Sequence, residues 1–326
     1  MLNPLNLLRR PSSAPFPRSS FEGVSRIASL SPDCLASSMP ADEILGINMR
    51  NALIAKYNPR SAIERARDKV AAKVALNAHG IATTGTICVI SEFGELMRFD
   101  PHKVLPDQWA IKPARGSQGD GILLAVGKSD GVWRRGSGAR MDADHVLNHI
   151  RKIVDGQFSG DSSSEDAALI EPLIQADPRF SGIADSGLPD LRMICLGSEP
   201  LMAMARFPTD ESDGKANLHQ GGIGAGIRMD TGVIHRAMQG PKVMTHHPDT
   251  GRAIVGYQIP GWQTCLELAS RCGEAIGLGY CGVDIVLDRN EGPLIIEVNA
   301  HPGLEIQNTN MQGLKGLMEL CGEVLR

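Results

Sequence analysis

The spacing of apolar residues changes several times along the chain, which predicts a mixture of helices and strands. Helical spacing begins at Ala41 and stops at Asn58-Pro59. Ser61 with Glu64 three residues later has the pattern of a capping box, so a second helix is expected from Ser61 to a left-handed C-cap at Gly80. From residue 81 onward the pattern changes to short apolar runs between turn signals, which is typical of strands.

The predicted strands and helices alternate without a strict βαβ order. Strands are expected at residues 84–90, 108–114, 121–127, 167–174, 190–197, 199–208, 281–288 and 292–300. A hairpin turn is expected at Asp130-Gly131, and helices are expected at 141–156 after the cap Asp142, at 262–277, and from about Met311. This order favours an α+β fold over one doubly wound sheet.

Composition narrows the class of protein. The 326 residues exceed the ~250–300 at which a single core stops growing, so two or more packed lobes are expected. A net charge of −4 and an aromatic content of 4% give no support for nucleic-acid binding. No apolar run approaches the ~18 residues of a membrane span.

Cysteine usage and the N-terminal region bear on the compartment. The seven cysteines form no CxxC, which indicates reduced thiols in a cytoplasmic protein, and Cys272 and Cys281 are interpreted as small core residues. Residues 1–40 are rich in Ser and Pro and predict a flexible arm. A targeting peptide is the alternative, but four prolines before residue 18 would break its amphipathic helix.

A glycine-rich segment follows one predicted strand. That strand delivers Lys112, and Gly116, Gly119 and Gly121 follow before the next strand. Closely spaced glycines let backbone N–H groups approach phosphate oxygens, and a lysine supplies a positive charge. A glycine-rich hairpin with a surface lysine is an equal alternative, and the segment is not a Walker A loop because GK[ST] is missing.

A second polar group lies in the last two predicted strands. Glu297 and Asn299 alternate with Val298, so they share one face, and a hairpin would bring Asp284 beside them. Two carboxylates and an amide oxygen are suitable ligands for Mg²⁺. A structural salt bridge could also compensate the buried charge, but neither apolar run contains Lys or Arg, which favours a metal.

Two arginines flank an apolar strand pair. Arg192 and Arg206 could stabilise charge on a transferring phosphoryl group, and a surface salt bridge is the alternative for either one.

Part of the chain resembles the ATP-grasp superfamily. The resemblance lies in the stretches KANLHQGG, GVDIV and EVNAHPGLE and in the order of Lys69, Lys112 with its glycine-rich segment, Glu171, Arg192, Asn217, Asp284, Glu297 and Asn299. The stretches ILGINMRN, YNPR, KPARGSQGDGI, PDLRMICLG and HPDTG are similar to the alpha-L-glutamate ligase-related proteins and to the glutamate ligase that extends a ribosomal protein's tail. The resemblance covers about Ile44 to the C-terminus. It implies two α/β lobes with ATP and Mg²⁺ between them.

The resemblance also implies a role for each matching position. Arg192 and Arg206 would contact the acyl-phosphate region, and Asp284, Glu297 and Asn299 would hold Mg²⁺, with Mn²⁺ as a substitute. The ATP-binding positions would be Lys69, Lys112, Gly116, Ser117, Gly119, Gly121, Glu171, Pro172, Leu173, Ile174, Asp190, Lys215 and Asn217.

The implied organisation is a flexible arm at 1–40, a helical segment at 41–80, a small lobe at 81–170 and a large lobe at 171–326. Only 68 residues precede Lys69, so the full domain that precedes the first ATP lysine in the glutamate ligase is expected to be missing. A partner chain, a second copy of this chain or the N-terminal arm could then complete the site.

The resemblance implies an ATP-dependent ligase that joins a carboxylate substrate to an amine, an amino acid or peptide, through an acyl phosphate. Two alternatives remain open at this point: a kinase that uses the same ATP site on a small molecule, and a non-catalytic partner protein that binds nucleotide.

Overall fold

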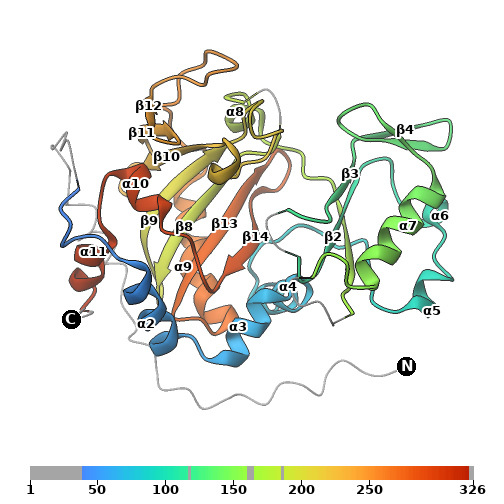
Figure 1. The fold of residues 1–326 in the computed structure, drawn as a ribbon, viewed down its shortest axis with the longest axis horizontal. Helices are drawn as coiled ribbons and strands as arrows, with labels where there is room; N and C mark the ends of the chain where they lie inside the picture. Colours follow the sequence, from blue (N-terminus) through green and yellow to red (C-terminus); the bar gives the residue numbers. More distant parts are fainter. Residues whose placement is uncertain (1–38, 117–118, 160–164, 185–186, 323–326) are drawn as a thin grey trace.

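 The computed structural model describes residues 39–116, 119–159, 165–184 and 187–322. The arm predicted at 1–40 lies outside these ranges except for its last two residues. Helices and strands are mixed, and the strands form two main antiparallel sheets that lie side by side (Figure 1).

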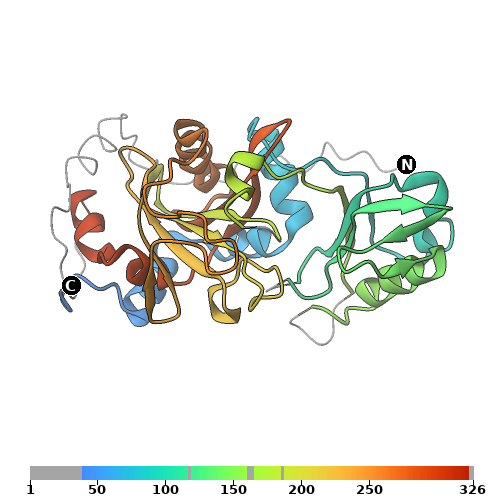
Figure 2. The same ribbon diagram turned by 90° about the horizontal axis from the view of Figure 1, so that it is seen from above.

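The smaller sheet and its helices form one end of the molecule, which we call the small lobe (Figures 1 and 2). Its four strands have the order β1-β7-β2-β3, and a three-stranded sheet β4-β5-β6 lies beside it. Its elements are β1 (Cys88–Ile90), α5 (Phe93–Leu96), α6 (Pro101–Val104), β2 (Trp109–Pro113), β3 (Leu123–Ala125), β4 (Gly127–Ser129), β5 (Val132–Arg134), β6 (Arg140–Met141), α7 (Ala143–Val154) and β7 (Ala168–Pro172). Trp109, Trp133 and Ile150 are fully buried in its core.

Two local predictions in this lobe are confirmed. Asp130 and Gly131 both have positive φ, 52° and 76°, at the turn between β4 and β5. The carboxylate of Asp142 accepts a hydrogen bond from the backbone N–H of His145 and caps α7.

The larger sheet has seven strands in the order β12-β11-β10-β9-β8-β13-β14, and we call it and its helices the large lobe. Its elements are α8 (Pro178–Ser181), β8 (Asp190–Leu196), β9 (Glu199–Phe207), the 3₁₀ turn η2 (Leu218–Gln220), β10 (Ile223–Ile227), β11 (Ile234–Gln239), β12 (Lys242–Met244), α9 (Trp262–Ile276), β13 (Tyr280–Asp288), β14 (Gly292–Asn299), α10 (Glu305–Asn310) and α11 (Leu314–Leu320).

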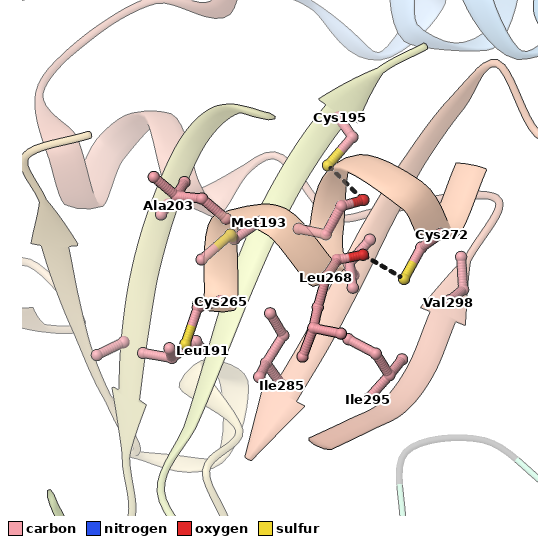
Figure 3. Packing of buried hydrophobic residues seen from close by; sticks show 14 of the residues in the cluster. Leu191, Met193, Cys195, Ala203, Cys265, Leu268, Cys272, Ile285, Ile295 and Val298 are labelled. Atoms are coloured by element: carbon pink, nitrogen blue, oxygen red, sulfur yellow. Dashed lines mark hydrogen bonds between the residues drawn. The ribbon is translucent and has the colours of Figure 1, made fainter. Parts of the chain in front are cut away.

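Helix α9 covers one face of the large sheet with an apolar core (Figure 3). Cys265 and Cys272 of α9 pack there against Cys195 and Cys281 of the central strands, and all four thiols are buried. Burial raises the pKa of Cys265 to about 12. The prediction that Cys272 and Cys281 are core residues is confirmed.

The opposite face of the large sheet is covered over part of its length by α2 (Ile47–Tyr57), α10 and α11. Leu53 and Ile54 of α2 pack there with Ile194 and Tyr280. Because side chains alternate along a strand, the residues two positions from Ile194 and four from Tyr280, Arg192 and Asp284, point to this same face. The polar groups of the sheet therefore lie beside the part that α2 covers.

The helical segment before the small lobe differs from the prediction. The single helix expected from Ser61 is two helices, α3 (Arg60–Arg67) and α4 (Lys69–Ala78). Asp68 has an extended backbone, and its side chain accepts hydrogen bonds from the N–H groups of Val70 and Ala71. The capping box at Ser61 is wrong, because α3 begins one residue earlier after Pro59 and has no side-chain cap. The ending at Gly80 is confirmed by a φ of 64°.

Two other boundaries were misplaced. The first helix begins at Ile47, not at Ala41, and α11 begins at Leu314 after a separate helix, α10, that was not predicted. Met311 has a φ of 51°, which ends α10 where the sequence suggested that a helix begins. Within the described residues, no helix is long and apolar enough to cross a membrane.

Candidate active site

The hairpin of β13 and β14 brings the predicted metal ligands together. Asp284 is paired with Glu297 across the two strands, and Gly282 is paired with Asn299. A β-bulge follows Asp284, so Ile296 is the extra residue on β14. Val298 packs in the core on the α9 side, which leaves Glu297 and Asn299 on the opposite side with Asp284.

Asp284 is compensated by arginines from neighbouring strands. Its carboxylate accepts two hydrogen bonds from Arg192, at 2.6 Å from Nε and 2.5 Å from Nη2, and one at 3.1 Å from Nη2 of Arg206. Arg206 also binds both carboxylate oxygens of Asp190, at 2.6 and 2.5 Å. The structural salt bridge that was the alternative for Asp284 is therefore present, and its partners come from β8 and β9 and not from the hairpin itself.

The arginines determine the charge of this cluster. Burial opposes ionisation of Asp284, but Arg192 and Arg206 outweigh it and lower the pKa of that carboxyl group. For Asp190, burial outweighs the attraction of Arg206 and raises the pKa. Asp284 is therefore ionised at neutral pH and has the charge that a metal ligand needs.

A pocket lies between the edge of the large sheet and the small lobe. It is bounded by α4, the strands β2 and β7, and the edge strand β14. Its lining residues are Ala66, Lys69, Ala72, Lys73, Leu76, Thr83, Lys112, Leu169, Glu171, Ile295, Ile296, Glu297 and Val298. Lys69, Lys112, Glu171 and Glu297, which lie far apart in the sequence, are thus brought to one pocket.

The carboxylate of Glu171 lies between two lysines. Lys73 contacts one of its oxygens and Lys112 the other, and Thr84 donates a hydrogen bond of 2.6 Å to the first oxygen. Lys73 was missed in the sequence. The signal was available, because Lys73 lies four residues after Lys69 and on the same face of a helix.

Burial and neighbouring charges shift the pKa values of the ionisable groups in this pocket in opposite directions. Burial lowers the pKa of Lys69 and of Lys73, although Glu297 and Glu171 respectively oppose this shift. Burial would raise the pKa of Glu171, but Lys112 and Lys73 reverse the effect and lower it. The pocket therefore holds Glu171 as a carboxylate at neutral pH.

The glycine-rich segment lies directly beside this pocket. The Nζ of Lys69 donates a hydrogen bond of 2.5 Å to the carbonyl of Gly116. A side chain at Gly121, which has a φ of 74°, would lie 2.6 Å from the ring of Phe158 and 2.7 Å from Pro113, so only glycine fits there. Gly119 also has positive φ, and Ser117 lies outside the described residues.

Several other predicted residues do not line this pocket. Pro172, Leu173 and Ile174 continue from Glu171 at the end of β7. Lys215 is exposed, and Asn217 caps η2 by accepting a hydrogen bond from the N–H of His219. Neither Lys215 nor Asn217 lines the pocket.

The comparison with protein families agrees with this arrangement. The profile of the family described as "Sugar-transfer associated ATP-grasp" matches residues 48–322. The chain belongs to this ATP-grasp family. Its mixed sheets and helices are therefore an ATP-grasp fold, as the α+β prediction and the resemblance indicated.

Two curated relatives are named as probable alpha-L-glutamate ligases. The chain is 26% identical over 273 residues to a probable alpha-L-glutamate ligase of Xanthomonas oryzae pv. oryzae, a match that covers 82% of this chain and 66% of the relative. It is 26% identical over 250 residues to a protein of the same name from Marinomonas sp., covering 76% of this chain and 60% of that one. The chain thus spans slightly less than two thirds of the length of these relatives.

Solved structures show a more distant likeness. A D-alanine–D-alanine ligase from Bacillus anthracis complexed with ATP has a TM-score of 0.44 and 13% identity, over 80% of this chain and 66% of that chain. The ATP-grasp ligase PsnB complexed with minimal precursor, Mg and ADP has a TM-score of 0.44 and 12% identity, over 82% and 62%.

Proposed function

We propose that this ATP-grasp chain is an ATP-dependent ligase that joins a carboxylate to an amine and releases ADP and phosphate. The observation that carries the proposal is that Glu297 of β14 belongs both to the pocket with the lysines and to the predicted metal ligands. The pocket contains Lys69 and Lys112, which suit phosphate oxygens, and Glu297 of the same pocket is paired across the hairpin with Asp284. A nucleotide phosphate and a divalent cation would therefore lie next to each other.

The donor set fits Mg²⁺. The β13–β14 hairpin offers two carboxylates, Asp284 and Glu297, and the amide of Asn299. The described residues contain no cluster of three or more His, Cys, Asp and Glu side chains that could hold a metal, so a cation bound here would take its other ligands from phosphates and water. Mg²⁺ is commonly held by one or two carboxylates together with substrate phosphates, and it keeps several waters. The Nδ2 of Asn299 donates a hydrogen bond of 3.4 Å to Asp284 Oδ2, and Glu297 is the strand partner of Asp284.

The proposed reaction has two steps. Mg²⁺ would be held by Asp284, Glu297 and Asn299 and would neutralise charge on the phosphates. Lys69 and Lys112 would bind phosphate oxygens while a substrate carboxylate attacks the γ-phosphorus and ADP leaves. An amine would then attack the acyl carbon, and phosphate would leave as the amide forms. Arg192 and Arg206, which pair with Asp284, would stabilise the charge of the acyl phosphate.

Other predicted positions have less direct roles. The carboxylate of Glu171 is already engaged by two lysines and Thr84, so we propose that Pro172–Ile174, and not this carboxylate, lie against the adenine. The segment around Gly116–Gly121 would cover the phosphates and exclude water, because acyl phosphates hydrolyse readily. Asp190, Lys215 and Asn217 keep the ATP-binding roles predicted from the resemblance.

The proposal is tested by screening ATP turnover with pairs of carboxylates and amines and by mass spectrometry of the products. We expect ADP and phosphate to be released only when both substrates are present, and hydroxylamine to trap the acyl group as a hydroxamate. A phosphorylated product without amide would indicate a kinase. Full turnover by Glu297→Ala would contradict both enzymatic readings, and nucleotide binding without any product would leave a partner protein.

A further inference from the structure

The loop after β14 folds back onto the face of the sheet that carries the metal ligands. A Cβ built on Gly282 would lie 2.7 Å from the Cβ of Pro302. Gly282 precedes Asp284 by two residues, so its missing side chain would point to the same face as Asp284. Pro302 therefore lies on that face, beside the strand position that pairs with Asn299.

Helix α2 places an arginine on this loop. Nη1 of Arg50 donates a hydrogen bond of 3.3 Å to the carbonyl oxygen of Pro302. The position of α2 is fixed by its C-cap residue Asn58, whose side-chain oxygen accepts hydrogen bonds from the N–H groups of Gly279 and Tyr280, at 3.0 Å each. The guanidinium group is thus held at the end of the hairpin that carries Asp284 and Glu297.

The charge of Arg50 is not balanced by a carboxylate in the described parts of the chain. Its other polar contacts are with the side-chain oxygen of Asn51, 3.3 Å from Nε and 3.0 Å from Nη2. A guanidinium group has five N–H donors, so donors remain for a ligand. The side chain is half-buried, which increases the cost of leaving its charge without an anion.

Arg50 thus holds unused donors on the loop that packs against the strand position paired with Asn299. Its place beside the predicted metal ligands indicates a site for an anionic part of a substrate.

We propose that Arg50 binds a substrate carboxylate that does not react, at the open end of the β13–β14 hairpin. This inference rests on the proposed function, and it narrows the substrate class to molecules such as amino acids that keep a free carboxylate beside the reacting group. The planar fork of a guanidinium group matches the two oxygens of a carboxylate. Arg50 would orient the substrate, and the chemistry would take place at the metal ligands.

The test uses the full chain with MgADP present and three probes of similar size. L-Glutamate has two carboxylates, L-glutamine has one and L-glutaminamide has none. Binding is measured by isothermal titration calorimetry for the natural chain, Arg50→Gln, Arg50→Lys and a control, Arg151→Gln. Arg151 is an exposed arginine of α7 and contacts Asn148.

We expect the natural chain to bind L-glutamate more tightly than L-glutaminamide. Arg50→Gln should weaken L-glutamate binding by about tenfold or more, since hydrogen bonds to charged groups are worth that much. Arg50→Lys should lose less, and Arg151→Gln should lose nothing. The melting temperature and the affinity for MgADP should be unchanged in Arg50→Gln, which shows that α2 and the nucleotide site are intact.

Three results would overturn the inference: no binding of either carboxylate probe to the natural chain, equal binding of all three probes, or equal affinities in Arg50→Gln. Inorganic phosphate serves as a fourth probe, and tighter binding of phosphate than of L-glutamate would also overturn it by assigning a phosphate site. Failure of the proposed function gives a different result, because MgADP would then not bind, or would bind equally well to Lys112→Met.

Discussion

At the scale of single residues, Lys73 and Lys112 differ although both contact Glu171. The ammonium group of Lys73 also lies near Thr84 Oγ1 at 2.9 Å, Gly85 O at 3.2 Å and Thr86 Oγ1 at 3.3 Å. Its three donors are therefore fully used by the protein. Lys112 makes one ion pair with Glu171 in the described part of the chain and has donors left for a phosphate.

This difference predicts that Lys73 affects nucleotide binding indirectly, through Glu171 and Lys112. Lys73→Met would leave Glu171 with one lysine, and the carboxylate would hold Lys112 more strongly and keep it from the nucleotide. We expect the affinity for MgADP to fall about tenfold, and the double variant with Glu171→Gln to recover part of this loss. Calorimetry measures both, with Lys152→Met of α7 as an exposed-lysine control. A double variant that binds no better than Lys73→Met would contradict the charge argument.

The lowered pKa of Glu171 predicts how stability depends on pH. A carboxyl group whose pKa is lower in the folded state stabilises the fold above its unfolded pKa, about 4.3, and loses that effect as the pH falls through the folded pKa. Glu171→Gln should therefore cost about 3 kcal/mol at pH 7, and the difference should shrink below about pH 4. Urea unfolding from pH 7 to pH 3 measures it. Glu267→Gln, at an exposed position of α9, should show almost no difference at any pH.

At the scale of elements, the break between α3 and α4 positions Lys69. Asp68 caps α4, so Lys69 begins the helix, and its backbone N–H donates a hydrogen bond of 2.9 Å to Ala114 O after β2. The cap thus ties the start of α4 to the strand that carries Lys112.

The effect of removing the Asp68 cap can be compared with that of removing a second helix cap, Asp142 of α7. Asp68→Ala and Asp142→Ala each remove a helix N-cap and should each cost about 1 kcal/mol of unfolding free energy. Only Asp68→Ala should also weaken MgADP binding, by several-fold, because α4 carries lysines of the pocket and α7 carries none. Chemical denaturation and calorimetry on both variants measure the two effects. Equal nucleotide affinities would show that the cap does not position Lys69.

The sequence was sufficient for elements whose signals are local. The hairpin at Asp130-Gly131 and the cap Asp142 depend on neighbouring residues, and both were predicted correctly. The helix break at Asp68 was missed because the helical spacing of apolar residues continues across it. The arginine partners of Asp284 were missed because strand neighbours in a sheet are set by topology, which a local pattern does not contain. The pairing of Lys73 with Glu171 was not predicted, because the two residues are 98 positions apart in the sequence.

At the scale of the whole molecule, β14 lies against the segment that leads from α4 into the small lobe. The N–H of Ile295 donates a hydrogen bond of 2.9 Å to Ala82 O, and Thr83 forms an isolated parallel bridge with Ile295. The pocket that we assign to the nucleotide is lined from both sides of this contact. A ligand bound there would connect the lobes.

This predicts local protection from hydrogen exchange. With MgADP, the amide of Ile295 should exchange at least tenfold more slowly, because separation of residues 82–83 from β14 would then also require release of the ligand from the pocket that both line. Val283 in the neighbouring strand β13 is bonded on both sides within the sheet and should change less. Mass spectrometry or NMR of exchange measures both amides. Equal slowing would indicate global stabilisation instead of a connection between lobes.

The position of β14 at the border of the large sheet has a consequence for solubility. A border strand leaves a row of unpaired N–H and C=O groups, onto which a strand of another molecule can add. In this chain the segment around Thr83 and helix α4 lie along that border and cover it. This cover belongs to the segment before the small lobe, whose Ala72, Leu76 and Ile81 pack in the core of the large lobe. A change that detaches α4 from that core would therefore expose β14 and make the chain prone to aggregate through it.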